Sequence, residues 1–185
     1  MIGRLPSTVE IDGIEYSIRT DFRDILTICQ AFNDEDLSSE ERWQVALKIF
    51  YINEVPSDIQ KAAKGIVWFI NCGNEEVSEQ NANDTPVYDW EQDEQLIFSA
   101  VNKVAGHETR ADQYMHWWTF MGLFQEVGES TFATVINIRN KKRKHKRLEK
   151  HEQDFYKENK QLIDIKRHIS KEEKEIKERM NQFLK

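Results

Sequence analysis

The sequence predicts a mainly α-helical protein, with an N-terminal β-hairpin packed on a helical bundle and a long basic C-terminal helical extension. Apolar and polar side chains alternate around a two-residue turn in residues 8–18. Beyond residue 21, apolar side chains recur every three or four residues, which is the helical period. Residues 141–185 are mostly charged and contain no proline or glycine, which favours an extended helix.

Length and composition indicate the number of domains and argue against a membrane or secreted protein. The chain has 185 residues, 39% hydrophobic and 32% charged, which suits one domain with an appendage. No run approaches the roughly 18 apolar residues that cross a bilayer, and no signal peptide precedes the hairpin. Cys29 and Cys72 are single cysteines within apolar helical patterns. We interpret them as buried free thiols of a protein in a reducing compartment. We therefore expect a cytosolic protein without a membrane partner.

The hairpin prediction rests on the residues around Asp12-Gly13. Val9 and Ile11 alternate with polar residues before this pair, and apolar residues alternate again after it. One hairpin is not stable alone in water, so we expect it to lie on the helices that follow.

Capping signals predict where the helices begin. Each is a side chain that can accept a hydrogen bond from the first helical turn. The predicted caps are Asp21, Ser38 with Glu41, Asp58 after Pro56, Asp89 with Gln92, and Ser130. Gly106 and Gly128 are predicted to end two of these helices.

Two divisions of the chain are predicted. Residues 71–85 are polar, acidic and without periodicity, which predicts a mobile loop that proteases cut first. Residues 1–130 would form the body and residues 131–185 the extension. Ser170 with Glu173 offers a further cap, so a break near residue 170 stays open.

The stretch YMHWWTFMGLF, residues 114–124, concentrates aromatic side chains on one predicted helix. Trp117 and Trp118 are adjacent and therefore point about 100° apart on a helix. One interpretation is that a bundle buries all of them. The other is that one side receives a partner helix, and its candidate contact residues are Trp117, Trp118, Phe120 and Phe124.

The extension carries a heptad series, meaning large apolar residues spaced by seven: Leu148, Phe155, Leu162, Ile169, Ile176 and Phe183. It is half of a coiled-coil pattern, because the complementary positions are mostly charged. Residues 141–185 have a net charge of +7 and residues 1–140 of −14. We expect the series to need a partner, namely another copy, the protein's own body or another protein, and we predict a homo-oligomer.

Motifs for catalysis or cofactors are not found in the sequence. It contains no CxxC pair, phosphate-binding loop or GxSxG, and His107-Glu108 lacks the second histidine of a zinc protease helix. We expect no enzyme activity, metal or cofactor. The basic run is a candidate docking segment for an acidic protein surface: Arg139, Lys141, Lys142, Arg143, Lys144, Lys146 and Arg147. A nucleic-acid partner is disfavoured, because the run has no aromatic residues and the body is acidic.

Three blocks of sequence carry a resemblance. They are Tyr88-Asp89-Trp90-Glu91-Gln92-Asp93, His116-Trp117-Trp118 with Phe120, and Thr131-Phe132 followed by Val135-Ile136, Ile138 and Arg139. With the lysine-rich segment, they resemble small helical proteins that long-tailed phages and prophages of Gram-positive bacteria encode just ahead of the tape-measure gene. The resemblance spans roughly residues 8–147. The charged tail continues beyond the point where we expect many relatives to stop.

The resemblance implies a tail assembly chaperone. Such a protein binds the tape-measure protein, helps to recruit tail-tube subunits, and is absent from the mature virion. It would act in the cytoplasm of the bacterial host. Two alternatives remain: a structural tail or head–tail connector component, or a nucleic-acid-binding regulator that uses the basic helix.

Overall fold

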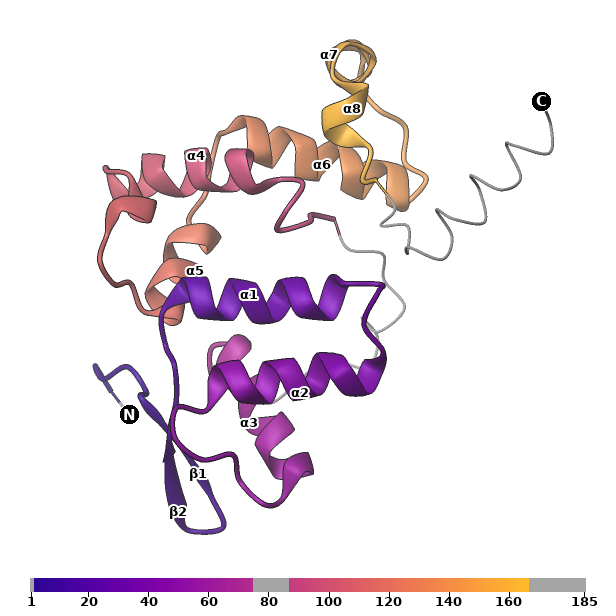
Figure 1. The fold of residues 1–185 in the computed structure, drawn as a ribbon. Helices are drawn as coiled ribbons and strands as arrows, with labels where there is room; N and C mark the ends of the chain where they lie inside the picture. Colours follow the sequence, from indigo (N-terminus) through magenta and orange to yellow (C-terminus); the bar gives the residue numbers. More distant parts are fainter. Residues whose placement is uncertain (1, 75–86, 167–185) are drawn as a thin grey trace, which may run out of the picture.

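The computed structural model describes residues 2–74 and 87–166 (Figure 1). The strands are β1 (Thr8–Ile11) and β2 (Ile14–Ser17). The helices are α1 (Phe22–Asn33), α2 (Ser39–Phe50), α3 (Ile59–Ile70), α4 (Glu94–Ala105), the 3-10 helix η2 (Thr109–Ala111), α5 (Trp117–Gln125), α6 (Thr131–Arg143), α7 (Lys150–Glu158) and α8 (Lys160–Ile163). The predicted class, mainly helical with an N-terminal hairpin, is confirmed.

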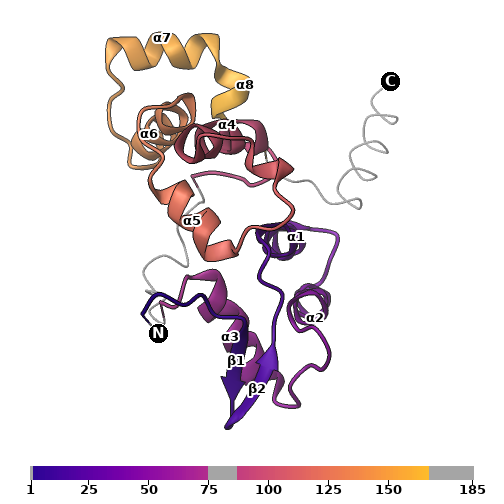
Figure 2. The same cartoon turned by 90° about the vertical axis from the view of Figure 1, so that its left-hand side faces the viewer.

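The helices form two groups joined by α1 and α5. The hairpin, α2 and α3 lie at one end of the molecule, and α4, α6, α7 and α8 are stacked at the other (Figures 1 and 2). One apolar cluster runs from the hairpin through α1, α2, α3 and α5 to α4 and the start of α6. The predicted division at residue 130 stays a prediction, although α6 itself packs on α4.

The hairpin forms as predicted. Asp12 and Gly13 adopt positive φ angles of 54° and 80°, which suits the two-residue turns preferred between antiparallel strands. Val9 and Ile11 are buried, and β1 lies on α3. The N–H of Ile52 donates to the Ser17 carbonyl at 3.1 Å, so the residues after α2 bond the outer edge of β2.

Most predicted caps are confirmed. The side chains of Asp21, Asp58 and Ser130 accept hydrogen bonds from the first turns of α1, α3 and α6, and Ser38 with Glu41 forms a full capping box on α2. The Asp89 carboxylate accepts from the N–H of Gln92 at 2.7 Å, but it caps a turn that precedes α4. Helix α4 itself begins at Glu94 and ends at Gly106, which adopts a φ of 77°.

The expectation of one continuous helix through the basic run is wrong. Helix α6 ends at Arg143, the chain turns at His145 with a φ of 50°, and α7 returns across α6. Cations in the last turn are favourable to the end of a helix, whereas like charges three or four residues apart oppose its continuation. The suggested break near residue 170 and residues 75–85 of the predicted loop lie outside the described residues.

Candidate partner-binding surfaces

The tryptophan stretch is mainly a core element. Trp117 is 1% exposed and Phe120 is fully buried, and the Phe120 ring stacks on Phe22 with centroids 4.7 Å apart. Helix α5 begins at Trp117, later than the sequence pattern suggests, and Tyr114 precedes it with 58% of its surface exposed. The core interpretation therefore describes Trp117 and Phe120, which offer no surface to a partner.

Trp118 and Phe124 are half-buried and lie against other aromatic rings. The indole N–H of Trp118 donates to the Phe69 carbonyl at 2.8 Å, and its ring meets Trp68 edge-on at 5.6 Å. The Phe124 ring lies 5.2 Å from Trp90. Both residues remain candidates for contact with a partner, but Trp118 also joins α5 to α3, and Phe124 joins α5 to the turn before α4.

His116 caps α5 with its side chain, a role that the sequence analysis did not assign. Its Nδ1 accepts the N–H of Trp118 at 3.0 Å, and its Nε2 lies 3.0 Å from the Pro6 carbonyl. These partners require a neutral ring with the proton on Nε2. Burial lowers the pKa of His116, and this agrees with the neutral form.

Arg139 is a buried structural residue rather than part of a docking segment. Its Nη2 donates to the Asp93 carboxylate at 2.9 Å and to the Leu162 carbonyl at 2.8 Å. The other guanidinium nitrogens donate to the carbonyls of Ile163 and Val87 and to the second Asp93 oxygen. Arg139 is 6% exposed and the Asp93 side chain 0%. This pair joins α6, α8 and the turn before α4.

Two lysines of the basic run are also engaged inside the protein. Lys141 bonds Glu152 at 2.6 Å, and Lys142 bonds Asp164 at 2.6 Å while its ammonium lies 3.9 Å from the centre of the Tyr156 ring. The hydrogen bond from Lys141 lowers the pKa of the Glu152 carboxyl. These contacts attach α7 and α8 to α6.

The rest of the basic run lies at and beyond the end of α6. Arg143 is half-buried and donates to the Asn140 side chain at 3.0 Å. Lys144, Lys146 and Arg147 are exposed at the turn before α7. These three, with Lys142 beside its partner Asp164, are the exposed residues of the docking segment.

The described half of the heptad series packs on helices of the same chain. Leu148, Phe155 and Leu162 surround a small cluster formed by Val135 and Ile138 of α6 with Ile163 of α8. These three residues therefore pack within their own chain, mainly on α6, which the predicted division at residue 130 assigned to the extension, and a partner for the rest of the series stays a prediction. Ile169, Ile176 and Phe183 lie outside the described residues.

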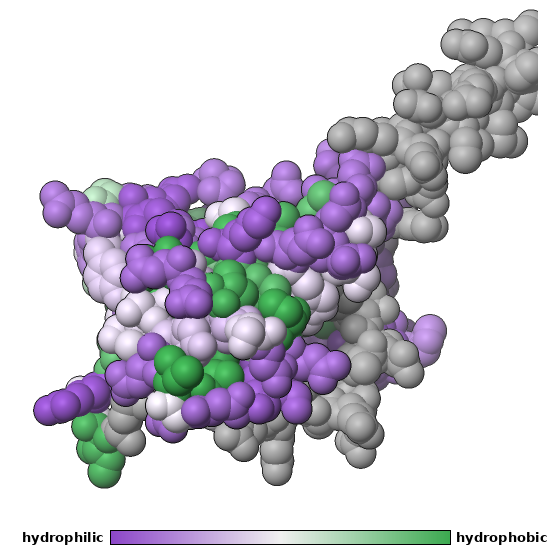
Figure 3. Space-filling model, turned by 60° about the horizontal axis from the view of Figure 1, so that its bottom comes forward, coloured by the Kyte–Doolittle hydropathy of each residue, from purple (hydrophilic) through white to green (hydrophobic). Residues whose placement is uncertain are grey.

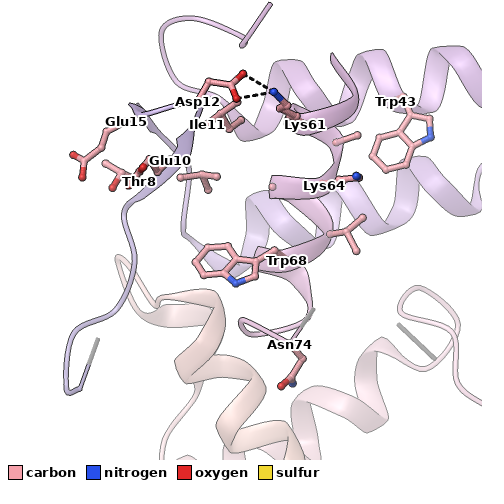
Figure 4. Close-up of a pocket in the computed structure, with 14 residues that line it drawn as sticks. Thr8, Glu10, Ile11, Asp12, Glu15, Trp43, Lys61, Lys64, Trp68 and Asn74 are labelled. Carbon is pink, nitrogen blue, oxygen red and sulfur yellow. Dashed lines mark hydrogen bonds and ion pairs between the residues drawn. The ribbon is translucent and has the colours of Figure 1, made fainter. Parts of the chain in front are cut away.

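A groove between β1 and α3 was not predicted from the sequence. It has a volume of about 930 Å³ and is lined by residues 8–12 of the hairpin, by the α3 residues Lys64, Val67 and Trp68, and by Trp43 of α2 (Figure 4). The Asp12 carboxylate accepts from Lys61 at 2.6 Å and fixes the hairpin turn against α3. Apolar residues gather near the middle of the molecular face in Figure 3, and hydrophilic residues surround them.

Residues 2–74 and 87–166 contain no group of three or more His, Cys, Asp or Glu side chains that could hold a metal ion. None of their helices combines the length and apolar character that a membrane span requires. Burial raises the pKa of the Cys29 thiol to about 11, so it is protonated at neutral pH.

A comparison with protein families gives a match that covers most of the chain. The chain belongs to the bacteriophage Gp15 protein family, whose profile matches residues 1–165. The resemblance to a phage protein family is thereby confirmed. The match extends past residue 147, where the resemblance was expected to stop, and it includes α7 and α8. Neither the curated proteins nor the solved structures provide a match.

Proposed function

We propose that this chain is a non-catalytic tail assembly chaperone that binds the tape-measure protein of its phage. The observation that supports the proposal most is membership of a bacteriophage protein family over residues 1–165, together with the motifs at residues 88–93, 116–120 and 131–139. It would help to recruit tail-tube subunits in the host cytoplasm and leave before the virion is complete.

The surfaces of the described residues are compatible with this role. A chaperone of an aggregation-prone chain needs apolar surface that accepts a partner, and it needs no reactive centre. The groove beside α3 offers Val67 and Trp68 in a depression rimmed by charged side chains. Trp118 and Phe124 add half-buried aromatic surface on α5.

The composition of purified virions tests this function against a structural role in the tail or connector. A chaperone is expected in infected cells during assembly and absent from purified particles. Quantitative mass spectrometry of infected cells and of purified particles measures the amount of this chain relative to the major tail-tube protein. A fixed number of copies in each mature particle would favour the structural alternative and contradict the chaperone.

Self-association through residues 167–185 is part of the proposal. The heptad residues Leu148, Phe155 and Leu162 already pack on α6, so the sequence leaves Ile169, Ile176 and Phe183 to contact another copy. We expect the full chain to be an oligomer, and a chain ending at Lys166 to be a smaller species with unchanged helical content.

Light scattering of the full and shortened chains measures this. The cut belongs after Lys166, because a chain ending at Asn140 would also uncover Val135 and Ile138 and remove two carbonyl partners of Arg139. High salt should weaken the association only partly, since apolar contacts are not screened. Equal subunit numbers for the full chain and the chain ending at Lys166 would contradict the proposal.

A further inference from the structure

The edge of β1, rather than one of its faces, borders the groove beside α3. Five consecutive residues, 8–12, line this groove, and successive side chains of a strand point to opposite faces. Val9 and Ile11 point toward the core, whereas Glu10 is exposed. Both kinds of residue can border one groove only when the strand presents its backbone edge to it.

The strand register shows which backbone groups point outward. Ile11 pairs with Ile14 across a two-residue turn, so this pair exchanges hydrogen bonds, as does every second pair along the ladder. The N–H of Ile18 donates to the Ser7 carbonyl at 3.1 Å, which agrees with this alternation. The N–H and C=O groups of Thr8 and Glu10 therefore point away from β2, toward the groove.

The two edges of the hairpin differ. The end of α2 and the residues after it already bond the outer edge of β2 and the chain that follows it, through Ile52 to Ser17 and Arg19 to Phe50. Among residues 2–74 and 87–166, β2 is the only strand that pairs with β1. The β1 edge is therefore the place in the described sheet where a third strand can be added.

Charge indicates what kind of strand fits. Glu10 and Glu15 are directly opposite each other on the outer face of the hairpin, and both are exposed. Like charges in that position destabilise a sheet, whereas a cation on a neighbouring strand would stabilise it. On the other face, an added strand would meet Trp68 and the side chain of Lys64 on α3, whereas Lys61 is already paired with Asp12. A second copy of β1 fits poorly, because it would bring further glutamates to this site.

We propose that β1 binds an extended segment of another protein as a third strand, and that lysine or arginine alternates with apolar residues in this segment. The cations would lie beside Glu10 and Glu15, the apolar residues would face α3, and the backbone would bond Thr8 and Glu10. This inference does not depend on the tape-measure protein being the partner.

The test uses the full chain and a blocked seven-residue peptide in which lysine alternates with valine. Titration calorimetry should show binding, and hydrogen exchange should show new protection of the Thr8 and Glu10 amides. A peptide with glutamate in place of lysine should bind about fivefold more weakly, since one opposed charge pair changes the free energy by up to about 1 kcal/mol. Equal binding of the two peptides would overturn the charge assignment.

Two variants separate backbone pairing from charge. Thr8→Pro removes an outward N–H at the first residue of the strand, without loss of a ladder bond or a charge, and should abolish binding. Glu10→Gln keeps the backbone and should lower affinity by a few-fold. If Thr8→Pro lowers the melting temperature, its loss of binding could come from unfolding. The affinity of Glu10→Gln and the protection of the Thr8 and Glu10 amides then show whether the peptide pairs with β1.

Three results would overturn the proposal: no binding of the lysine–valine peptide, binding that leaves the Thr8 and Glu10 amides unprotected, or protection of these amides without peptide that increases with protein concentration. The last would show that a second copy pairs with β1. Failure to bind the tape-measure protein would leave this peptide result unchanged, so the two proposals can fail separately.

Discussion

Replacing Arg139 with methionine is expected to destabilise the protein by about 3–5 kcal/mol, because the substitution leaves a buried carboxylate without its cation. Asp93 is fully buried, and its remaining partner is the N–H of Asp89 at 3.0 Å. The carbonyls of Leu162 and Ile163 would also lose their donor, so α8 should detach from α6. Urea unfolding at neutral pH measures the loss of stability.

Two further variants show whether the ion pair causes this effect. Lys144→Met changes the same charge at an exposed position and should alter stability by less than about 0.5 kcal/mol. The double variant Asp93→Leu with Arg139→Met removes both charges and should be more stable than Arg139→Met alone. An Arg139→Met protein as stable as Lys144→Met would show that the pair does not hold α6, α8 and the turn before α4 together.

Replacing Trp117 with alanine is expected to cost about 3–5 kcal/mol, the usual range for removing a large core aromatic side chain. Its indole N–H donates to the Ile70 carbonyl at 2.9 Å, and its ring lies 5.8 Å from Phe120. The change leaves a cavity between α5 and α3 and an unpaired carbonyl. A loss of this size would unfold most of a marginally stable domain.

Trp118→Ala provides the matched comparison. Trp118 is half-buried, so the same truncation should cost less stability than at Trp117 and should reduce partner binding if α5 contacts a partner. Thermal melting and a tape-measure pulldown compare the two proteins. Equal melting temperatures for Trp117→Ala and wild type would contradict the burial of Trp117.

The sequence predicted those parts of the fold that local signals determine. The Asp12-Gly13 turn, the capping box of Ser38 with Glu41 and the Ser130 cap depend on residues a few positions apart. Each has its own chemical requirement, a positive φ or an acceptor for unpaired N–H groups, so each is visible in a short window of sequence.

The parts that were missed depend on residues far apart in the chain. In the sequence, Asp93 is one acidic residue of the block at 88–93, and Arg139, 46 positions away, is one cation of a basic run. Only packing of α6 on α4 brings them together. One feature of the sequence could have indicated the pair. Arg139 directly follows the apolar residues Ile136 and Ile138 and precedes the lysines, so it lies at the border of the apolar pattern.

The candidate site also depends on residues that are far apart in the chain. The sequence left open whether the tryptophan stretch is core or contact surface, and it indicated a basic docking segment; Trp117, Phe120 and Arg139 are buried. The groove joins three segments, residues 8–15, 43 and 61–74, and no single one of them has a binding motif. Its most informative feature is the outer edge of β1, which pairs with no other strand in residues 2–74 and 87–166, and it becomes evident only when the strand register and the position of α3 are known.

Co-expression with the tape-measure protein of the same phage tests the proposed function most directly. The tape-measure protein should be insoluble when produced alone, and it should become soluble and co-purify when this chain is present. A chain carrying Arg139→Met, which is expected to be destabilised, should rescue less of it. The soluble fraction of the tape-measure protein, quantified on gels, is the readout. A tape-measure protein that stays insoluble, or is soluble but does not bind this chain, would contradict the chaperone assignment.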